Sequence, residues 1–267
     1  MKTEDTITGN FHTHTFRCKH AVGDIPDYAA KAVEKNLKVL GISDHTPFPD
    51  RKKWCYERMD IDLLDSYDRA FMRAREAHPD LKIVKGMECD WDPEYTNFYT
   101  DELRGARNCV YLIGSVHYLR HEDKWICCYS GGEVCGMVRQ YGEAVVKMIE
   151  SRVFDFVGHP DLFGLFTLKW DAETIKASEE ICKAAKKNNI PLEINGGGFR
   201  RAPVEASEGT RYPYPIDAFW EIAADYEVEV ICNSDAHLPD DVIASVDLCR
   251  EIVKKNNLKL ALLHFMQ

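Results

Sequence analysis

Histidine, aspartate and glutamate recur in this sequence at spacings that suit metal binding. His12 and His14 stand two residues apart, and Asp235 and His237 repeat that spacing near the other end of the chain. Residues i and i+2 of an extended strand point to the same side, so each pair can direct both side chains toward one ion. Similar short motifs elsewhere complete one candidate ligand set: His12, His14, His20, His45, Glu88, His117, His159, Asp235 and His237.

The donor types in this set indicate which metals it would bind. Imidazole and carboxylate without thiolate suit zinc, manganese or iron and argue against a pure calcium or magnesium cage. Nine donors exceed the four of a single tetrahedral ion, so the set predicts two to three divalent transition metals, Zn, Mn or Fe. One motif alone would be weak evidence. Together, so many titratable groups would repel one another or stay desolvated without a metal.

Most of these candidates follow short apolar runs that predict buried strands, near residues 7–11, 38–42, 82–87, 110–114, 154–158, 191–194 and 228–232. Apolar residues at helical spacing predict helices over 25–36, 63–78, 136–151, 174–188, 215–225 and 242–255. Alternating strands and helices indicate a parallel sheet covered by helices. Seven strands in this length favour a closed or nearly closed α/β barrel, with the candidate ligands at the C-terminal ends of its strands. The apolar stretch 258–263 would close the barrel, cover its bottom or meet a partner subunit.

Composition excludes several classes of protein. The 267 residues are 45% hydrophobic and 29% charged, which is typical of a globular chain and not of a disordered one. The net charge of −10 argues against nucleic acid and anionic membranes as partners. No signal-like or membrane-spanning segment is evident, and the ten cysteines are scattered. We therefore expect a cytoplasmic protein with reduced, mainly structural cysteines.

Clustered metals activate water near neutral pH and clamp phosphoryl groups. The residues alone thus predict a multinuclear metallohydrolase, most naturally a phosphoesterase acting on a small phosphorylated substrate.

The motifs HTHTFRCKH, GISDHTPFP, GMECDWDPEY, GSVHYL, GHPDL and NSDAH occur here in the order found in the polymerase-and-histidinol-phosphatase (PHP) superfamily. The chain resembles the monofunctional histidinol-phosphatases of that superfamily over nearly its whole length. The resemblance implies a distorted (β/α)7 TIM-like barrel, with residues 1–267 as one domain, and a trinuclear site. It implies one metal on His12, His14, Glu88 and Asp235, a second on Glu88, His117 and His159, and a third on His20, His45 and His237.

The implied reaction converts L-histidinol phosphate and water to L-histidinol and phosphate, in histidine biosynthesis. A metal-bridging hydroxide would attack phosphorus in line, while metals and a nearby arginine neutralise the developing charge. Asp44 is a candidate for protonating the leaving group. The alternative is that Asp44 orients a ligand imidazole.

Phosphate recognition is assigned to Arg200, because similar histidinol-phosphatases carry an Asn-x-x-Gly-x-Arg stretch like that from Asn195 to Arg200. Arg201 is interpreted as a solvated loop charge. The sequence departs from the family after GHPDL, where Phe163 and Gly164 replace the usual basic residues; Arg17 or Lys169 could compensate. This departure keeps alternatives open: a PHP phosphoesterase for another small phosphomonoester or a nucleotide, or a non-catalytic metal-binding interaction module. Oligomeric state is not predicted.

Overall fold

The computed structural model describes residues 9–50, 57–122 and 124–266. Its main sheet has eight parallel strands in the order β1-β2-β3-β4-β7-β8-β11-β12. The strands are β1 (Gly9–Asn10), β2 (Val39–Ile42), β3 (Lys82–Asp90), β4 (Tyr111–Ser115), β7 (Phe156–Val157), β8 (Leu192–Asn195), β11 (Glu229–Asn233) and β12 (Lys259–Leu260). Since consecutive strands in this order are neighbours, their C-terminal ends all meet at one face.

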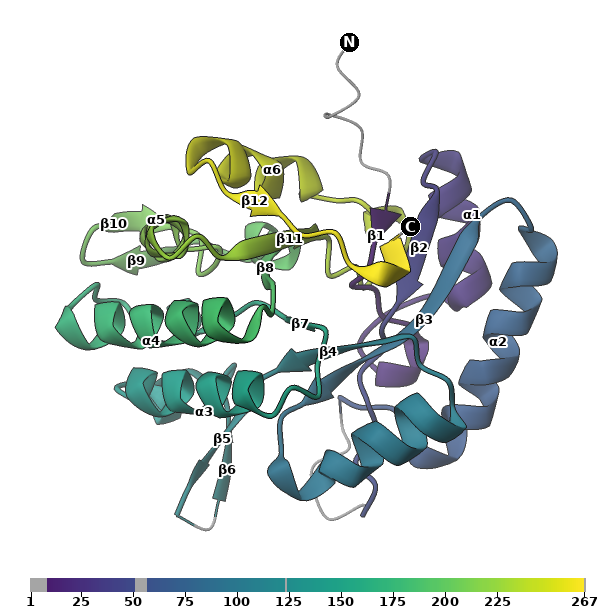
Figure 1. Ribbon diagram of the computed structural model, residues 1–267, viewed down its shortest axis with the longest axis horizontal. Helices are drawn as coiled ribbons and strands as arrows, with labels where there is room; N and C mark the ends of the chain where they lie inside the picture. Colours follow the sequence, from purple (N-terminus) through teal and green to yellow (C-terminus); the bar gives the residue numbers. More distant parts are fainter. Residues whose placement is uncertain (1–8, 51–56, 123, 267) are drawn as a thin grey trace.

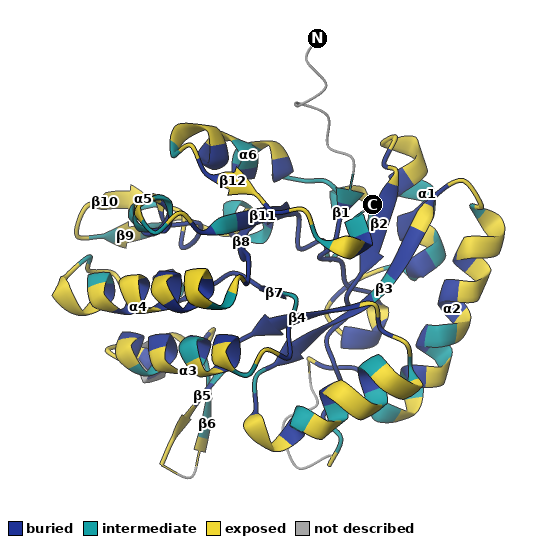
Figure 2. Ribbon diagram, viewed as in Figure 1, coloured by how far each residue is buried: buried dark blue, intermediate teal, exposed yellow. Residues whose placement is uncertain are grey.

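Helices connect the strands and cover the outside of the sheet (Figure 1). The α-helices are α1 (Ile25–Glu34), α2 (Leu64–Ala77), α3 (Val138–Glu150), α4 (Ala172–Asn188), α5 (Asp217–Asp225) and α6 (Val246–Lys255). Each buries one face and exposes the other, while the strands of the main sheet are mostly buried, except for β12, which is exposed (Figure 2). Local chemistry defines the helix ends: Asp24 caps α1 in a capping box with Asp27, and Asp171 caps α4.

The chain after β1 pairs with the chain after β11 beside the predicted metal ligands. Thr13, just after β1, forms a parallel bridge with Ala236, just after β11. The backbone N–H of His14 donates to the Ala236 carbonyl at 2.8 Å, and that of Ala236 donates to the His12 carbonyl at 3.1 Å. At the N-terminal end of β11, the neighbouring strand is β12 and not β1. The seven predicted strands therefore curl into a distorted barrel that joins at its C-terminal face.

Aromatic side chains fill the barrel interior. Tyr111 is fully buried, donates a hydrogen bond to the Phe11 carbonyl at 2.8 Å and stacks on Phe265. Its ring occupies space that Gly41 and Gly86 leave free, since a Cβ at either position would collide with it. Phe265 comes from the chain after β12, so the C-terminal segment both extends the sheet and covers the barrel interior.

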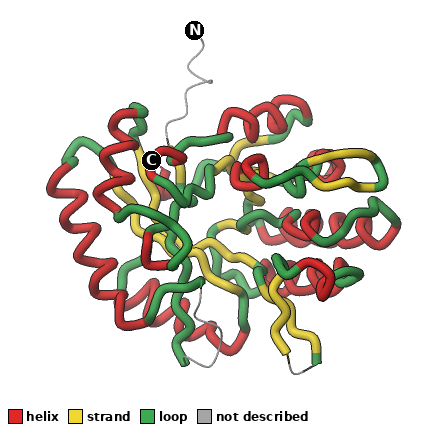
Figure 3. Tube along the Cα trace, turned by 180° about the vertical axis from the view of Figure 1, so that it is seen from behind, coloured by secondary structure: helices red, strands yellow, loops and turns green. Residues whose placement is uncertain are grey.

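All seven predicted strands and all six predicted helices are present, with ends shifted by a few residues; the start of the first predicted strand lies outside the described residues. The predicted α/β barrel is confirmed. The prediction missed a π-helix at Phe98–Ala106 and two hairpins, β5 (Tyr118–His121) with β6 (Lys124–Cys127) and β9 (Val204–Ala206) with β10 (Gly209–Arg211). The β5–β6 hairpin projects from the body of the molecule (Figure 3), whereas the β9–β10 hairpin is tied to the segment after β7, for example by Ser207 N donating to the Leu168 carbonyl at 2.8 Å. Among the described residues, no helix is long and apolar enough to span a membrane.

Candidate metal centre

The structure brings all nine predicted ligands together at the C-terminal face of the barrel. Glu88 lies within β3, and the others follow β1, β2, β4, β7 and β11. Most are buried, whereas His20 is exposed and His237 is partly exposed. His159 and Asp235 adopt positive φ angles of 29° and 55°. Residues other than glycine rarely adopt positive φ angles. Each such angle costs about 1–3 kcal/mol, and these angles recur at functional sites.

Glu88 lies at the middle of the cluster and faces two groups of histidines. Its Oε1 lies 3.0 Å from Nε2 of His159 and 3.3 Å from Nε2 of His117. Its Oε2 lies 2.9 Å from Nδ1 of His45, 3.3 Å from Nε2 of His12 and 3.5 Å from Nε2 of His14. One carboxylate is thus positioned to bridge two neighbouring ions.

Asp235 and the outer histidines extend the cluster. Oδ1 of Asp235 lies 3.1 Å from Nε2 of His14, so His12, His14 and Asp235 can share an ion. His20, His45 and His237 form a second possible ligand group, in which the Nε2 atoms of His20 and His237 are 3.1 Å apart.

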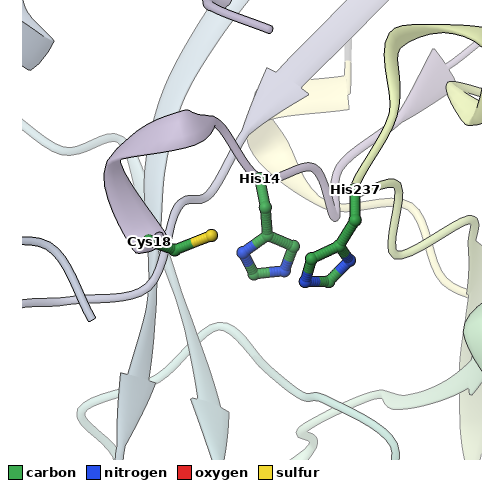
Figure 4. A group of neighbouring side chains, drawn as sticks. All are labelled: His14, Cys18 and His237. Atoms are coloured by element: carbon green, nitrogen blue, oxygen red, sulfur yellow. The ribbon is translucent and has the colours of Figure 1, made fainter. Parts of the chain in front are cut away.

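Cys18 is an additional side chain near these ligands. Its Sγ lies beside the stacked rings of His14 and His237 (Figure 4), within reach of a shared ion. Burial raises the pKa of the Cys18 thiol, which donates a hydrogen bond to the Thr15 carbonyl at 3.1 Å. A neutral, hydrogen-bonded thiol is a poor ligand, since the thiolate is the form that binds metal. All nine described cysteines are free.

Several buried side-chain atoms in the cluster lie near oppositely charged groups but make no well-aligned hydrogen bond to the described residues: His12 Nε2, His14 Nε2, His45 Nδ1 and Glu88 Oε2. A buried polar group without a partner costs roughly 1–3 kcal/mol, and a charged group costs more. Divalent cations would coordinate these atoms. The residues present therefore fit a metal centre of two to three ions.

Burial and neighbouring charges shift the pKa values of the clustered side chains in different directions. Burial disfavours its charges, but the histidines around Glu88 and Asp235 hold the pKa values of both carboxyls well below their usual range. Burial and the neighbouring His14 lower the pKa of His237 to about 3, which leaves this imidazole neutral and ready to coordinate. Burial opposes protonation of His117, yet Glu88 and Asp90 raise its pKa to about 9. A metal at His117 must therefore displace a proton.

Two buried carboxylates outside the predicted ligand set accept hydrogen bonds from imidazoles of candidate ligands. Glu193 accepts from His12 Nδ1 at 2.8 Å, and Asp90 accepts from His117 Nδ1 at 2.7 Å. Neither residue was among the candidates predicted from the sequence. Glu193 was detectable as a charge within an apolar strand run, and Asp90 as the residue two positions after Glu88. Asp44, the candidate leaving-group acid, lies 3.7 Å from Nδ1 of His14 and does not line the pocket. Its position fits the alternative role of orienting an imidazole.

Two arginines predicted to bind substrate lie elsewhere. Arg17 is 1% exposed and forms a forked ion pair with Asp24, with Nη1 to Oδ1 at 2.6 Å. The Nη atoms of Arg200 donate to backbone carbonyls, among them those of Ser234 at 2.7 Å and Asp235 at 2.9 Å. Neither lines the pocket at the centre, so both substrate-binding assignments need revision. Arg200 instead holds the backbone of a ligand segment.

A pocket of about 400 Å³ opens onto the centre. Two other arginines line it, Arg58 and Arg201. Arg58 is buried and forks onto Asp90, with Nη2 to Oδ1 at 3.0 Å. Arg201, interpreted from sequence as a solvated loop charge, is exposed, and its Nε donates to Tyr214 Oη at 3.0 Å. The pocket thus combines metal ligands with two fixed positive charges, which suits an anionic substrate.

Comparison with known proteins agrees with this geometry. The PHP domain model matches residues 10–197. A "Probable histidinol-phosphatase" from Deinococcus radiodurans is 29% identical over 239 residues, which cover 86% of each chain. A "Probable phosphatase" from Shewanella amazonensis is 23% identical over 265 residues, covering 96% of this chain and 90% of the relative. A histidinol phosphate phosphatase from Lactococcus lactis, solved with Zn, L-histidinol and phosphate, shares the fold. Its TM-score is 0.75 at 18% identity, over 97% of this chain and 98% of that one.

Proposed function

Since the chain belongs to the PHP domain family, we propose that it is a metal-dependent histidinol-phosphatase that hydrolyses L-histidinol phosphate to L-histidinol and phosphate. The observation that carries the proposal is Glu88, whose two oxygens face five histidines beside a pocket with two arginines. The Deinococcus and Lactococcus proteins support the choice of substrate by their names. In this function the chain takes part in histidine biosynthesis.

The proposed ligand assignment follows the three groups of donors. His12, His14 and Asp235 would hold one ion with Glu88, which would share the second with His117 and His159. The third would lie between His20, His45 and His237. When bound, clustered divalent metals such as Zn, Mn or Fe supply Lewis-acid charge and a nucleophile at neutral pH.

The chain's own residues position the reacting groups. Glu193 and Asp90 fix the tautomers of His12 and His117, because each accepts from Nδ1 and leaves Nε2 free to coordinate. We assign Asp44 a positioning role at His14, whose Nδ1 lies 3.7 Å from Oδ1 of Asp44. Arg58 and Arg201 place positive charge where negative charge develops on the phosphoryl oxygens.

The segment after GHPDL keeps a second substrate class open. Phe163 is fully buried, and a Cβ at Gly164 would collide with the Pro213 carbonyl, so neither position can carry a basic side chain into the pocket. This favours, as the alternative, another small phosphomonoester or a nucleotide. Tyr118 lines the pocket and could contact either substrate; Trp54, which could also do so, lies outside the described residues. A non-catalytic metal-binding module would leave the pocket arginines without a role.

The remaining features of the proposal follow from the whole chain. Residues 1–267 would act as one domain, because Asp235 and His237 lie beyond the matched PHP region yet complete the centre. The net charge of −10 disfavours nucleic acid and anionic membranes as partners, and a cytoplasmic location suits the free cysteines.

Phosphate release from L-histidinol phosphate, measured beside a panel of phosphomonoesters, tests this function. The protein is loaded with manganese or zinc, and a chelated sample is the control. Selective, chelator-sensitive release from L-histidinol phosphate is expected. Release from other esters alone would keep the phosphatase and discard the substrate, and no release from any ester would contradict both.

A further inference from the structure

Arg201 differs from the other arginines near the centre in how its guanidinium is used. Its Nε donates to Tyr214 Oη at 3.0 Å, and its Cζ lies 4.7 Å from the centroid of the Tyr129 ring. Neither Nη atom donates a hydrogen bond to any of the described residues. The guanidinium is therefore held on one edge and one face, and its outer Nη edge stays available.

The two neighbouring candidates lack this free edge. Arg200 uses both Nη atoms on backbone carbonyls and does not line the pocket. Arg58 lines the pocket, but its Nε and Nη2 fork onto Asp90 and its Nη1 donates to the Glu57 carbonyl at 2.6 Å. A guanidinium already paired with a carboxylate has less capacity for a second anion.

The tyrosines that hold Arg201 also contact proposed metal ligands. The Tyr129 ring stacks on His117, with centroids 6.0 Å apart, and the Tyr214 ring lies 6.1 Å from that of His159. Tyr214 is fully buried, so its hydroxyl is a fixed acceptor for Arg201 Nε. The guanidinium is thereby held beside the ion that His117 and His159 would share with Glu88.

A free guanidinium edge matches two non-bridging oxygens of a phosphoryl group. We infer that Arg201, clamped between Tyr129 and Tyr214, binds the phosphoryl group of the substrate through its two Nη atoms. In this chain Arg201 supplies the positive charge that Phe163 and Gly164, the residues after GHPDL, do not provide. The inference rests on the proposed phosphatase function and assigns its anion-binding residue.

The test compares Arg201→Gln and Arg201→Lys with Arg139→Gln, an exposed control on α3, each as metal-loaded full-length protein. The readouts are inhibition by inorganic phosphate, KM and kcat for the substrate, metal content, and calorimetric titration with inorganic phosphate. Loss of charge-assisted hydrogen bonds should weaken phosphate binding and raise KM by about tenfold or more in Arg201→Gln. Metal content should stay unchanged. Arg201→Lys should recover part of the loss, because it restores charge without the planar fork.

Tyr129→Leu provides a second variant that leaves the guanidinium present but removes the ring beneath it. It should weaken phosphate binding less than Arg201→Gln does, with unchanged metal content. The inference is overturned if Arg201→Gln binds inorganic phosphate as the wild type does, or if it loses metal. Failure of the proposed function gives a different pattern: no ester is hydrolysed by the wild type, while phosphate titration still distinguishes Arg201→Gln from the control.

Discussion

Glu193 on β8 accepts a hydrogen bond from Nδ1 of His12 on the neighbouring side of the barrel, at 2.8 Å and across 181 positions of sequence. Its other oxygen accepts from the backbone N–H of His159 at 3.0 Å. Although β8 supplies no candidate ligand, its Glu193 thus holds in place His12, which follows β1, and His159, which follows β7. Because Glu193 is completely buried, water does not compete for these hydrogen bonds.

Replacing Glu193 tests this support directly. Glu193→Ala should lower metal content and kcat/KM by about 10–100-fold, the usual effect of removing a hydrogen-bond partner of a metal-binding histidine. Glu193→Gln should lose less, since its amide oxygen can still accept from His12. Metal analysis and steady-state kinetics measure both effects. Glu179→Ala, an exposed change on α4, is the control. Equal metal content in all three variants would contradict the supporting role.

The ligand assignment predicts a stronger effect at His12 and Asp235. His12→Ala or Asp235→Ala should abolish hydrolysis and lower the bound metal measured by mass spectrometry, because each removes a donor from the buried group around His14. His121→Ala is the matched control, since His121 is exposed on β5 and lies outside the pocket. Near-normal turnover in either ligand variant would refute the centre.

Features that depend only on residue type and on position relative to a strand, such as the set of candidate ligands, could be predicted from the sequence. The clustering of the candidate ligands could be predicted because parallel strands bring their C-terminal ends together, although His12 and Asp235 lie far apart in the chain. Side-chain direction was not predictable in the same way. Arg200 and Arg201 are adjacent and chemically identical, but Arg200 ends a 3-10 turn and donates to backbone carbonyls, whereas Arg201 lies beyond the turn and faces the pocket. Only tertiary contacts distinguish them.

Asp161 predicts how stability depends on pH. Its Oδ2 accepts from Ile216 N and Trp220 Nε1, but burial raises the pKa of the carboxyl to about 7. The folded state therefore binds this proton more tightly than the unfolded state, whose pKa is near 3.8. The resulting stabilisation is fully present below pH 3.8 and is lost as the pH rises through about 7.

Asp161→Asn removes this titration and retains an oxygen acceptor. The free energy of unfolding of the variant relative to wild type should increase by about 3 kcal/mol between pH 5 and pH 9. Chemical denaturation at each pH measures the difference. Asp225→Asn, an exposed change on α5, should keep a constant difference from wild type. A constant difference for Asp161→Asn as well would show that the carboxyl titrates normally.

Metal removal should destabilise the fold because the centre buries unpaired donors. A ligand present at 100 times its Kd stabilises the folded state by about 2.7 kcal/mol, and for a domain of this size each kcal/mol shifts Tm by about 2–4 °C. Chelation should therefore lower Tm by about 5–10 °C, and added zinc or manganese should restore it. Glu88→Gln, which weakens the carboxylate between the two histidine groups, should show much less of this chelator-dependent shift. Scanning calorimetry with and without chelator measures both proteins. An equal shift in Glu88→Gln would mean that the stabilising metal lies elsewhere.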